Sequence, residues 1–240
     1  MPLPKINTPT YELVLPSNGK KIKYRPFLVR EEKILIMAME SEDMKQITNA
    51  IVQILSDCII SKDVKVESLS TFDIEYLFLN VRGKSVGETV EVNITCPDDG
   101  ETQVEMVIDI DSIKVQKIKG HKNIIKLDDN LSMKLKYPSL EQFVENNFEV
   151  AETQSSVGQS LSMITSCIEM VYNNDESWEA TDCTKEELEE FIEQLNTKQF
   201  KEIENFFTTM PKLSHTIVVK NPNTGMESEV VLEGLASFFS

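Results

Sequence analysis

Val90-Glu91-Val92-Asn93-Ile94-Thr95 runs directly into Cys96-Pro97-Asp98-Asp99-Gly100, a strand pattern followed by a turn pattern. Apolar residues alternate with polar ones before the turn, and the alternation returns after it at Val104, Met106 and Ile108. A period of two predicts paired strands with one buried face. Proline, aspartate and glycine suit a tight reversal. The sequence therefore predicts a β-hairpin at this point.

The same turn recurs as Asn221-Pro222-Asn223-Thr224-Gly225, which is 125 residues later, between Ile217-Val218-Val219 and Val230-Val231. Three other short motifs also recur, in the same order along the chain: Lys23-Tyr24-Arg25-Pro26 as Lys136-Tyr137-Pro138, Ser56-Asp57-Cys58-Ile59 as Thr165-Ser166-Cys167-Ile168, and Leu69-Ser70-Thr71 as Leu195-Asn196-Thr197. The order predicts an α+β fold made of two tandem pseudo-repeats, residues 1–115 and residues 116–240.

Each repeat is expected to contain a hairpin, then helices, then a closing hairpin. Asn18-Gly19 is a strong hairpin signal between two short strands, and 128–130 is the corresponding turn in the second repeat. The Tyr-Pro step after each opening hairpin favours a helix start. Apolar residues at three- and four-residue spacing predict these helices: residues 44–60, 72–81, 157–172 and 198–208. Ser70-Thr71-Phe72-Asp73 is read as a capping box for the helix that starts at residue 72.

The second repeat has an insert of acidic character. Thr184 and Glu187 form a predicted capping box at the start of a helix over residues 185–195. Cys58 and Cys167 fall on the apolar faces of matching helices, so both are expected to be buried thiols. The short linker between the repeats suggests that the copies touch.

The bulk composition is that of an ordinary globular protein. The chain has 240 residues, of which 40% are hydrophobic, and its net charge is −16. This charge argues against a nucleic-acid partner, because phosphate binding requires clustered lysine and arginine. The longest apolar run, Ile34 to Met39, is too short for a membrane span, and no signal-peptide core is visible. Four cysteines without paired spacing favour a reduced, cytosolic compartment.

The charge is unevenly distributed. Residues 1–36 carry seven bases and three acids, whereas residues 175–207 carry eleven acids and three bases. The simplest explanation of both charged segments is that they form solvent-exposed surface. The alternative is attraction between subunits or toward a basic partner, because complementary potentials steer association.

No catalytic, cofactor or metal site is predicted. Gly83-Lys84-Ser85 resembles the end of a phosphate-binding loop, but Phe78 stands where that motif requires glycine. Cys96-Pro97-Asp98-Asp99-Gly100 lacks the second thiol of a zinc knuckle, and Asn221 replaces the thiol in the matching turn. A turn with a structural glycine is the better account. His121 and His215 have no fixed spacing to a nucleophile or carboxylate.

Three segments carry a family resemblance: Tyr24-Arg25-Pro26-Phe27-Leu28-Val29-Arg30-Glu31-Glu32-Lys33, Phe72-Asp73-Ile74-Glu75-Tyr76, and Val81-Arg82-Gly83-Lys84-Ser85-Val86-Gly87. Through these segments, the chain resembles the baseplate hub subunit or hub-assembly proteins of T-even-like contractile-tailed bacteriophages. A weaker similarity to the same family covers Leu232 to Phe239. The resemblance is strongest over residues 9–100. Members of that family often carry a second cysteine in the closing turns, where this chain has Asp99 and Thr224. A metal-stabilised hairpin is therefore doubtful here.

The resemblance implies a non-enzymatic tail protein without cofactors, found in the virion baseplate and, during assembly, in the host cytoplasm. It implies a hub subunit or an assembly factor that binds other tail or hub proteins. The alternative is a chaperone for the tape measure or a hub protein, absent from the mature virion. Self-association is a further option, and neither nucleic acid nor membrane is expected as a partner. The candidate interface residues are Tyr24, Arg25, Pro26, Phe27, Arg82, Lys84, Phe238 and Phe239. For Tyr24, Pro26, Phe27, Phe238 and Phe239, core packing is the favoured alternative.

Overall fold

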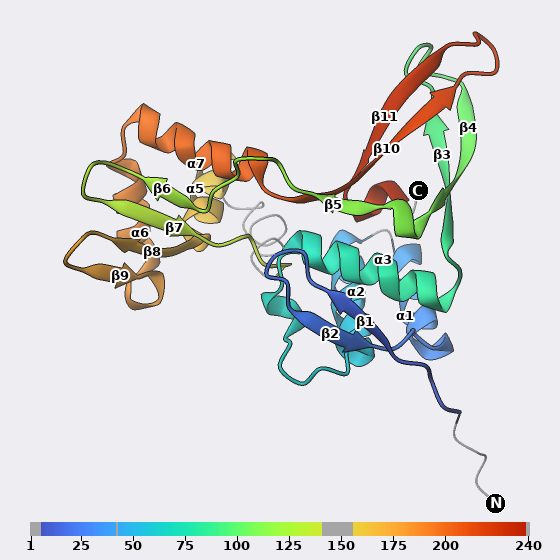
Figure 1. Cartoon of the computed structure of the whole chain (residues 1–240), viewed down its shortest axis with the longest axis horizontal. Helices are drawn as coiled ribbons and strands as arrows, with labels where there is room; N and C mark the ends of the chain where they lie inside the picture. Colours follow the sequence, from blue (N-terminus) through green and yellow to red (C-terminus); the bar gives the residue numbers. More distant parts are fainter. Residues whose placement is uncertain (1–5, 42, 141–155, 239–240) are drawn as a thin grey trace, which may run out of the picture. The chain divides into compact units, whose positions relative to one another are not determined.

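The computed structural model describes residues 6–41, 43–140 and 156–238, and its helices and small antiparallel sheets confirm the α+β class (Figure 1). The chain divides into two compact units. The first lies within Met1–Val66, Phe72–Gln116 and Lys212–Ser240, and the second within Glu67–Thr71 and Lys117–Pro211. The closing hairpin of the second predicted repeat thus belongs to the first unit. The compact units are not the predicted repeats, and the repeats stay a prediction.

The first unit opens with the predicted hairpin and continues into helices. Its elements are β1 (Tyr11–Val14), β2 (Lys21–Tyr24), α1 (Val29–Glu40), α2 (Met44–Cys58) and α3 (Thr71–Ser85). The short 3-10 helix η1 (Val66–Ser68) spans the point in the sequence where the chain passes from the first unit to the second. Asp43 caps α2, because its carboxylate accepts the N–H groups of Lys45 and Gln46. Asp73 accepts the N–H of Ser17 at 3.0 Å and thereby ties the first turn to α3. The predicted capping box is wrong, because Oγ of Ser70 has no hydrogen-bond partner among the described residues and Asp73 binds a residue distant in sequence.

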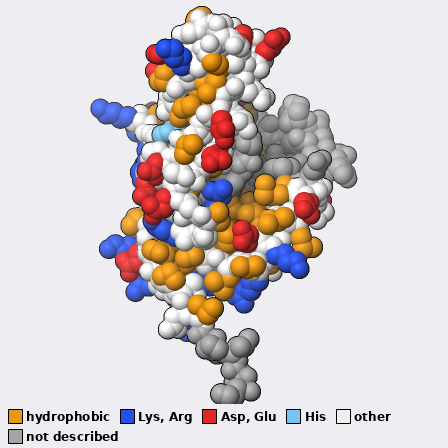
Figure 2. Space-filling view, turned by 90° about the vertical axis from the view of Figure 1, so that its right-hand side faces the viewer, with side chains coloured by type: hydrophobic (Ala, Val, Ile, Leu, Met, Phe, Trp, Pro, Cys, Tyr) orange, Lys and Arg blue, Asp and Glu red, His pale blue; other side chains and the backbone are white. Residues whose placement is uncertain are grey.

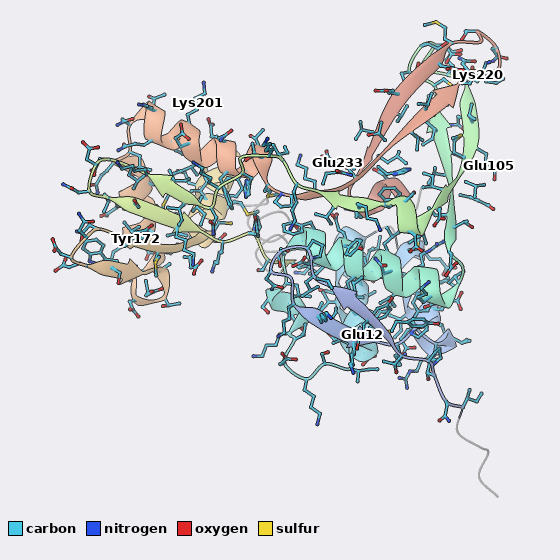
Figure 3. All side chains as sticks on the ribbon, viewed as in Figure 1. Glu12, Glu105, Tyr172, Lys201, Lys220 and Glu233 are labelled. Carbon is cyan, nitrogen blue, oxygen red and sulfur yellow. The ribbon has the colours of Figure 1, made fainter. Side chains whose placement is uncertain are left out.

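Two closing hairpins complete the first unit. Their elements are β3 (Thr89–Thr95), β4 (Gln103–Asp109), η2 (Ile110–Ser112), β5 (Lys114–Gln116), β10 (Lys212–Lys220), β11 (Glu227–Glu233) and η5 (Leu235–Phe238). Strands β3 and β4 pair with each other, and β10 lies between β11 and β5. In Figure 3, the label Glu105 marks β4, Lys220 marks β10 and Glu233 marks β11.

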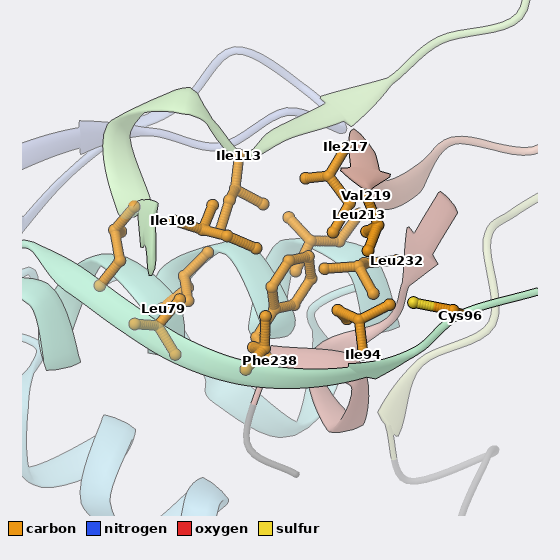
Figure 4. Packing of buried hydrophobic residues seen from close by; sticks show 13 residues of the cluster. Leu79, Ile94, Cys96, Ile108, Ile113, Leu213, Ile217, Val219, Leu232 and Phe238 are labelled. Atoms are coloured by element: carbon orange, nitrogen blue, oxygen red, sulfur yellow. The ribbon is translucent and has the colours of Figure 1, made fainter. Parts of the chain in front are cut away.

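The inner faces of these hairpins share one hydrophobic core (Figure 4). Phe238 is fully buried within it, and Leu79 contributes from α3. The alternation of apolar and polar residues explains this arrangement, since it directs every second side chain inward. The core contains Leu79, Val90, Val92, Ile94, Cys96, Ile108, Ile110, Ile113, Leu213, Ile217, Val219, Leu232 and Phe238.

The second unit is a four-stranded antiparallel sheet with helices. Its elements are β6 (Ile124–Lys126), β7 (Ser132–Leu135), α5 (Ser156–Ser166), β8 (Ile168–Tyr172), β9 (Ser177–Glu179), η4 (Ala180–Asp182), α6 (Lys185–Glu193) and α7 (Thr197–Thr209). The strand order is β6-β7-β8-β9. The acidic helix α6 begins with the predicted capping box between Thr184 and Glu187.

The predicted helix over residues 157–172 is wrong in its second half. The helix α5 ends at Ser166, and Ile168–Tyr172 forms β8, which pairs with β7. Ile168 and Val171 are both buried. Their spacing fits a helix face, but β-branched and aromatic residues also suit a strand, and β7 supplies the hydrogen bonds.

Cys58 and Cys167 are both buried, as predicted; Cys58 is the last residue of α2, and Cys167 directly follows α5. Cys58 and Cys167 are each 0% exposed, and burial raises the pKa of both thiols to about 11. Protonated, buried thiols are poor nucleophiles and poor metal ligands. Cys58 and Cys167 therefore act as core residues.

Replacing Gly100 with valine is expected to destabilise the β3–β4 hairpin by about 1–3 kcal/mol. Gly100 has a φ of +70°, in the left-handed region that a β-branched residue strongly disfavours. Urea unfolding measures the loss. Gly100→Asn is the control, because asparagine tolerates this conformation. A valine variant as stable as the asparagine variant would contradict the backbone assignment.

Candidate protein-binding surface

A buried carboxylate positions the start of α1. Glu31 is 0% exposed, and its oxygens accept the N–H of Leu28 at 2.7 Å, Nη2 of Arg25 at 3.0 Å and Nε of Arg30 at 2.6 Å. Burial alone would raise the pKa of this carboxyl, but the hydrogen bonds from Arg25, Arg30 and Leu28 lower the pKa to about 2. Glu31 is thus charged at neutral pH, and its contacts fix the first turn of α1.

The segment before α1 is held from a second side. The N–H of Phe27 donates to Oγ of Ser85 at 2.9 Å, and that hydroxyl donates to the carbonyl of Val81 in α3. Arg25 also donates from Nη1 to the carbonyl of Pro26 at 2.9 Å. The helix predicted to follow the Tyr-Pro step therefore begins at Val29, three residues after Pro26.

One face of α1 carries exposed apolar side chains. Glu31 and Ala38, seven residues apart, are its buried residues, so they mark the inward face. Val29 and Ile36, also seven residues apart, lie on the opposite face and are 80% and 50% exposed. A run of six apolar residues, Ile34 to Met39, extends around the whole helix at 100° per residue. Since only one stripe can face the core, Ile36, Met37 and Met39 are exposed, whereas Ile34 and Leu35 are half-buried.

We call Leu28, Val29, Ile36, Met37 and Met39 the α1 patch. Met37 is 60% and Met39 is 44% exposed, and Leu28 is 40% exposed. Figure 2 shows hydrophobic side chains gathered over the lower, helical part of the face it displays. Contiguous exposed apolar surface is typical of protein–protein contact sites. Methionine suits such a surface because its flexible thioether adapts to different partners.

The residues predicted for an interface lie mostly in the core or at its edge. Tyr24, Phe27 and Phe238 are 2%, 7% and 0% exposed. Pro26 is buried as well, and Arg25 is half-buried in the contacts described above. The structure therefore supports the core-packing alternative for the buried residues. Their role in an interface stays a prediction.

The remaining predicted residues belong to α3 and the C-terminal segment. Arg82 is half-buried. Nζ of Lys84 forms an ion pair with Oε1 of Glu88 at 2.6 Å and lies 5.8 Å from the ring centre of Tyr11. Phe239 lies outside the described residues. The structure thus brings Tyr24, Arg25, Pro26 and Phe27 together beside α3, and it places Phe238 in the hairpin core.

The Gly83-Lys84-Ser85 motif forms the end of α3 and not a loop. Gly83 is explained by packing, because a Cβ there would lie 3.3 Å from Cδ1 of Ile110. Within the described ranges, no three side chains of His, Cys, Asp or Glu are grouped as a metal site would require. Across the same described residues, no helix combines the length and the apolar character that a membrane span requires.

Sequence reasoning missed the α1 patch, although its signal was present. The signal is the apolar run Ile34–Met39, which is too short for a membrane span but too long to fit on one face of a helix. On a helix, six consecutive apolar residues predict exposure of about half of them. That periodicity argument finds the patch without a structure.

Comparison with known proteins gives two matches. The family described as T4 bacteriophage base plate protein matches residues 8–240. The "Baseplate hub assembly protein gp26" of Enterobacteria phage T4 is 23% identical over 232 residues, which cover 95% of this chain and 97% of that protein. No solved structure matches the chain.

Proposed function

Because the chain belongs to the T4 bacteriophage base plate protein family, we propose that it is a non-enzymatic tail protein that acts through protein–protein contacts. It serves as a structural subunit of the baseplate hub or as a factor required for hub and tail assembly. The observation that carries this proposal is the family match along almost the whole chain. The T4 relative is named for hub assembly, and its length is nearly fully matched.

The α1 patch is the proposed contact surface. Helix α1 has 12 residues, which corresponds to a length of about 18 Å. Val29 and Ile36 are two helical turns apart, as in the anchors of helices that bind an apolar groove. We assign this patch to another baseplate or tail protein that presents such a groove. A second copy of this chain is the competing occupant, and measurement of the oligomeric state separates the two.

The second candidate function is an assembly chaperone for the tape measure or a hub protein, which leaves before the virion matures. The exposed glutamates of α6 favour it, since Glu186, Glu187, Glu190 and Glu193 are all exposed on one nine-residue helix. Contacts made by exposed charges form quickly and weaken with salt. Such contacts suit a partner that is later released.

We also propose that the chain arose from two copies of one module, residues 1–115 and 116–240. Tyr24 forms a β-bridge with Ile59, and Leu135 pairs with Ile168, so the residue after each buried cysteine pairs with an opening hairpin. The carbonyl of Cys58 accepts the N–H of Arg25 at 2.9 Å, and that of Cys167 accepts the N–H of Lys136 at 2.8 Å. Strands β4 and β11 also have the same alternation of burial. These similarities support a duplication.

Mass spectrometry of purified virions tests the choice between subunit and chaperone. We expect peptides of this chain at a ratio to known baseplate proteins that stays constant through successive gradient purifications. A subunit is retained because stable interfaces bury about 1,600 Å², whereas a released factor is lost. Phage-encoded proteins that act only inside the host serve as the negative control. Peptides that fall to the level of that control would favour the chaperone, with the protein confined to the host cytoplasm.

A further inference from the structure

The turns of the two closing hairpins are joined by side-chain hydrogen bonds. Nδ2 of Asn221 donates to Oδ1 of Asp98 at 3.0 Å and to Oδ2 of Asp99 at 2.8 Å. Oγ1 of Thr224 donates to Oδ2 of Asp98, and Nδ2 of Asn223 donates to Oγ1 of Thr102 at 2.9 Å. These contacts connect residues that lie more than 120 positions apart in the sequence.

The two turns have the same backbone arrangement. The N–H of Gly100 donates to the carbonyl of Cys96 at 2.9 Å, and the N–H of Gly225 donates to the carbonyl of Asn221 at 2.8 Å. The two glycines have φ values of +70° and +76°. Cys96 and Asn221, the first residues of the turns, are each 1% exposed. The recurring turn motif of the sequence therefore becomes a pair of equivalent turns in contact with each other.

Paired turns of this kind hold zinc when each supplies two thiolates at a spacing of Cys-x-x-Cys. The four corresponding positions here are Cys96, Asp99, Asn221 and Thr224, so one thiol remains of four. Cys96 is 1% exposed and belongs to the shared hairpin core, so packing explains the remaining thiol.

The amide of Asn221 also argues against a cation. Its Nδ2 donates hydrogen bonds toward both carboxylates, and its Oδ1 accepts the N–H groups of Asn223 and Thr224, so both polar atoms of the amide are engaged within the turns. The hydroxyl of Thr224 and the amide of Asn221 lower the pKa of Asp98, so this acceptor is charged at neutral pH. The residues present do not fit a zinc ion, and they satisfy one another without it.

We infer that the paired turns are a metal-independent clasp, in which hydrogen bonds from Asn221, Asn223 and Thr224 to the first turn replace the four metal ligands of a double knuckle. The shared core holds the hairpins together along their inner faces, and the clasp fixes their tips. The two hairpins thereby form one rigid element of the first unit.

Metal analysis of the native protein is the first test. We expect less than about 0.1 equivalents of zinc after purification without chelators, because three of the four ligand positions lack a thiolate. We also expect EDTA to leave the Tm unchanged. Stoichiometric zinc, or a Tm that falls on addition of EDTA, would overturn the inference.

The substitution Asn221→Asp tests the clasp itself. It replaces the buried amide donor with a third carboxylate that faces Asp98 and Asp99. We expect the Tm to fall by about 5 °C or more, since a buried charge is left without a partner. Asn18→Asp is the matched control, because Asn18 only accepts a hydrogen bond, from the N–H of Lys20, and aspartate keeps that role. Equal Tm values for the two variants would reject the clasp.

The converse test restores a metal site. We expect the triple variant Asp99→Cys, Asn221→Cys, Thr224→Cys, together with native Cys96, to bind one equivalent of Co²⁺ with the absorption of tetrahedral thiolate coordination. The double variant Asp99→Cys, Thr224→Cys, which keeps Asn221, is expected to bind at least 100-fold more weakly because it offers three thiols. Failure of the triple variant to take up the metal, whether folded or not, would contradict the equivalence of the turns.

Discussion

Replacing Glu31 with glutamine is expected to destabilise the first unit by about 3 kcal/mol, within the 3–5 kcal/mol typical of a broken buried ion pair. Glutamine keeps the size of the side chain, but it removes the charge that Arg25 and Arg30 share. The Arg25 side chain is 15% exposed and would retain only uncharged partners, which are the glutamine amide oxygen, the carbonyl of Pro26 and the thiol of Cys58. For a chain of this length, the Tm is expected to fall by about 6–12 °C.

Glu32→Gln is the matched control. It lies at the next position of the same helix and also removes one negative charge. We expect it to change the free energy of unfolding by less than about 0.5 kcal/mol, as is usual for surface substitutions. Calorimetry or urea unfolding measures both variants. If the two are equally stable, the Arg25–Glu31 pair contributes nothing to the fold.

The effect of Glu31 should also depend on pH in a defined direction. Its pKa is about 2 in the folded protein, against about 4.3 in an unfolded chain. The stability it contributes is therefore present above about pH 4.3 and is lost as the pH falls toward 2. Since one pKa unit corresponds to 1.36 kcal/mol, this contribution is about 3 kcal/mol. The unfolding free energies of the native protein and of Glu31→Gln should converge over this window.

The hairpins were predictable because their information is local. Asn18-Gly19, the Pro-x-x-Gly turns and the period-two strands all specify structure within about twenty residues. The cap at Thr184 is local in the same way, and its helix is found at the predicted position. The pairing of β10 with β5, by contrast, joins Ser214 with Lys114 across a hundred residues. No local pattern specifies that partner, so the placement of the closing hairpin in the first unit was not predicted.

The candidate site was only partly predictable for a related reason. Tyr24 and Phe27 were selected from a family motif, and a motif does not distinguish a buried residue from an exposed one. The structure explains both residues by packing, because Tyr24 and Phe27 are buried and the N–H of Phe27 is anchored on Ser85. The contact between Asp98 and Asn221 is a comparable case. The recurring turns are visible in the sequence, but no sequence pattern indicates that the two turns touch each other. Exposure depends on which elements cover a segment, and this is a property of the whole fold.

The double substitution Ile36→Glu, Met37→Glu is expected to weaken binding of the protein to its baseplate partner by at least 100-fold. Each exposed apolar side chain that fills a partner's pocket contributes about 2 kcal/mol or more, and a buried charge in its place adds a penalty. Complementation of a phage that lacks this gene measures the result as the number of infectious particles. We expect the Tm of the variant to remain within about 3 °C of the native value, because the two native side chains are 50% and 60% exposed.

The double substitution Val107→Glu, Val231→Glu separates loss of the α1 patch from a general effect of added charge. These valines are 62% and 61% exposed, and they lie on β4 and β11, away from α1. The control variant is expected to support infection at the native level. Light scattering on the purified proteins measures their oligomeric state. If the native protein is a dimer and the α1 variant is a monomer, the α1 patch binds a second copy of this chain. Equal infectivity of the two variants would show that the α1 patch is not the contact surface, because two added glutamates would then be tolerated equally on α1 and on the hairpins.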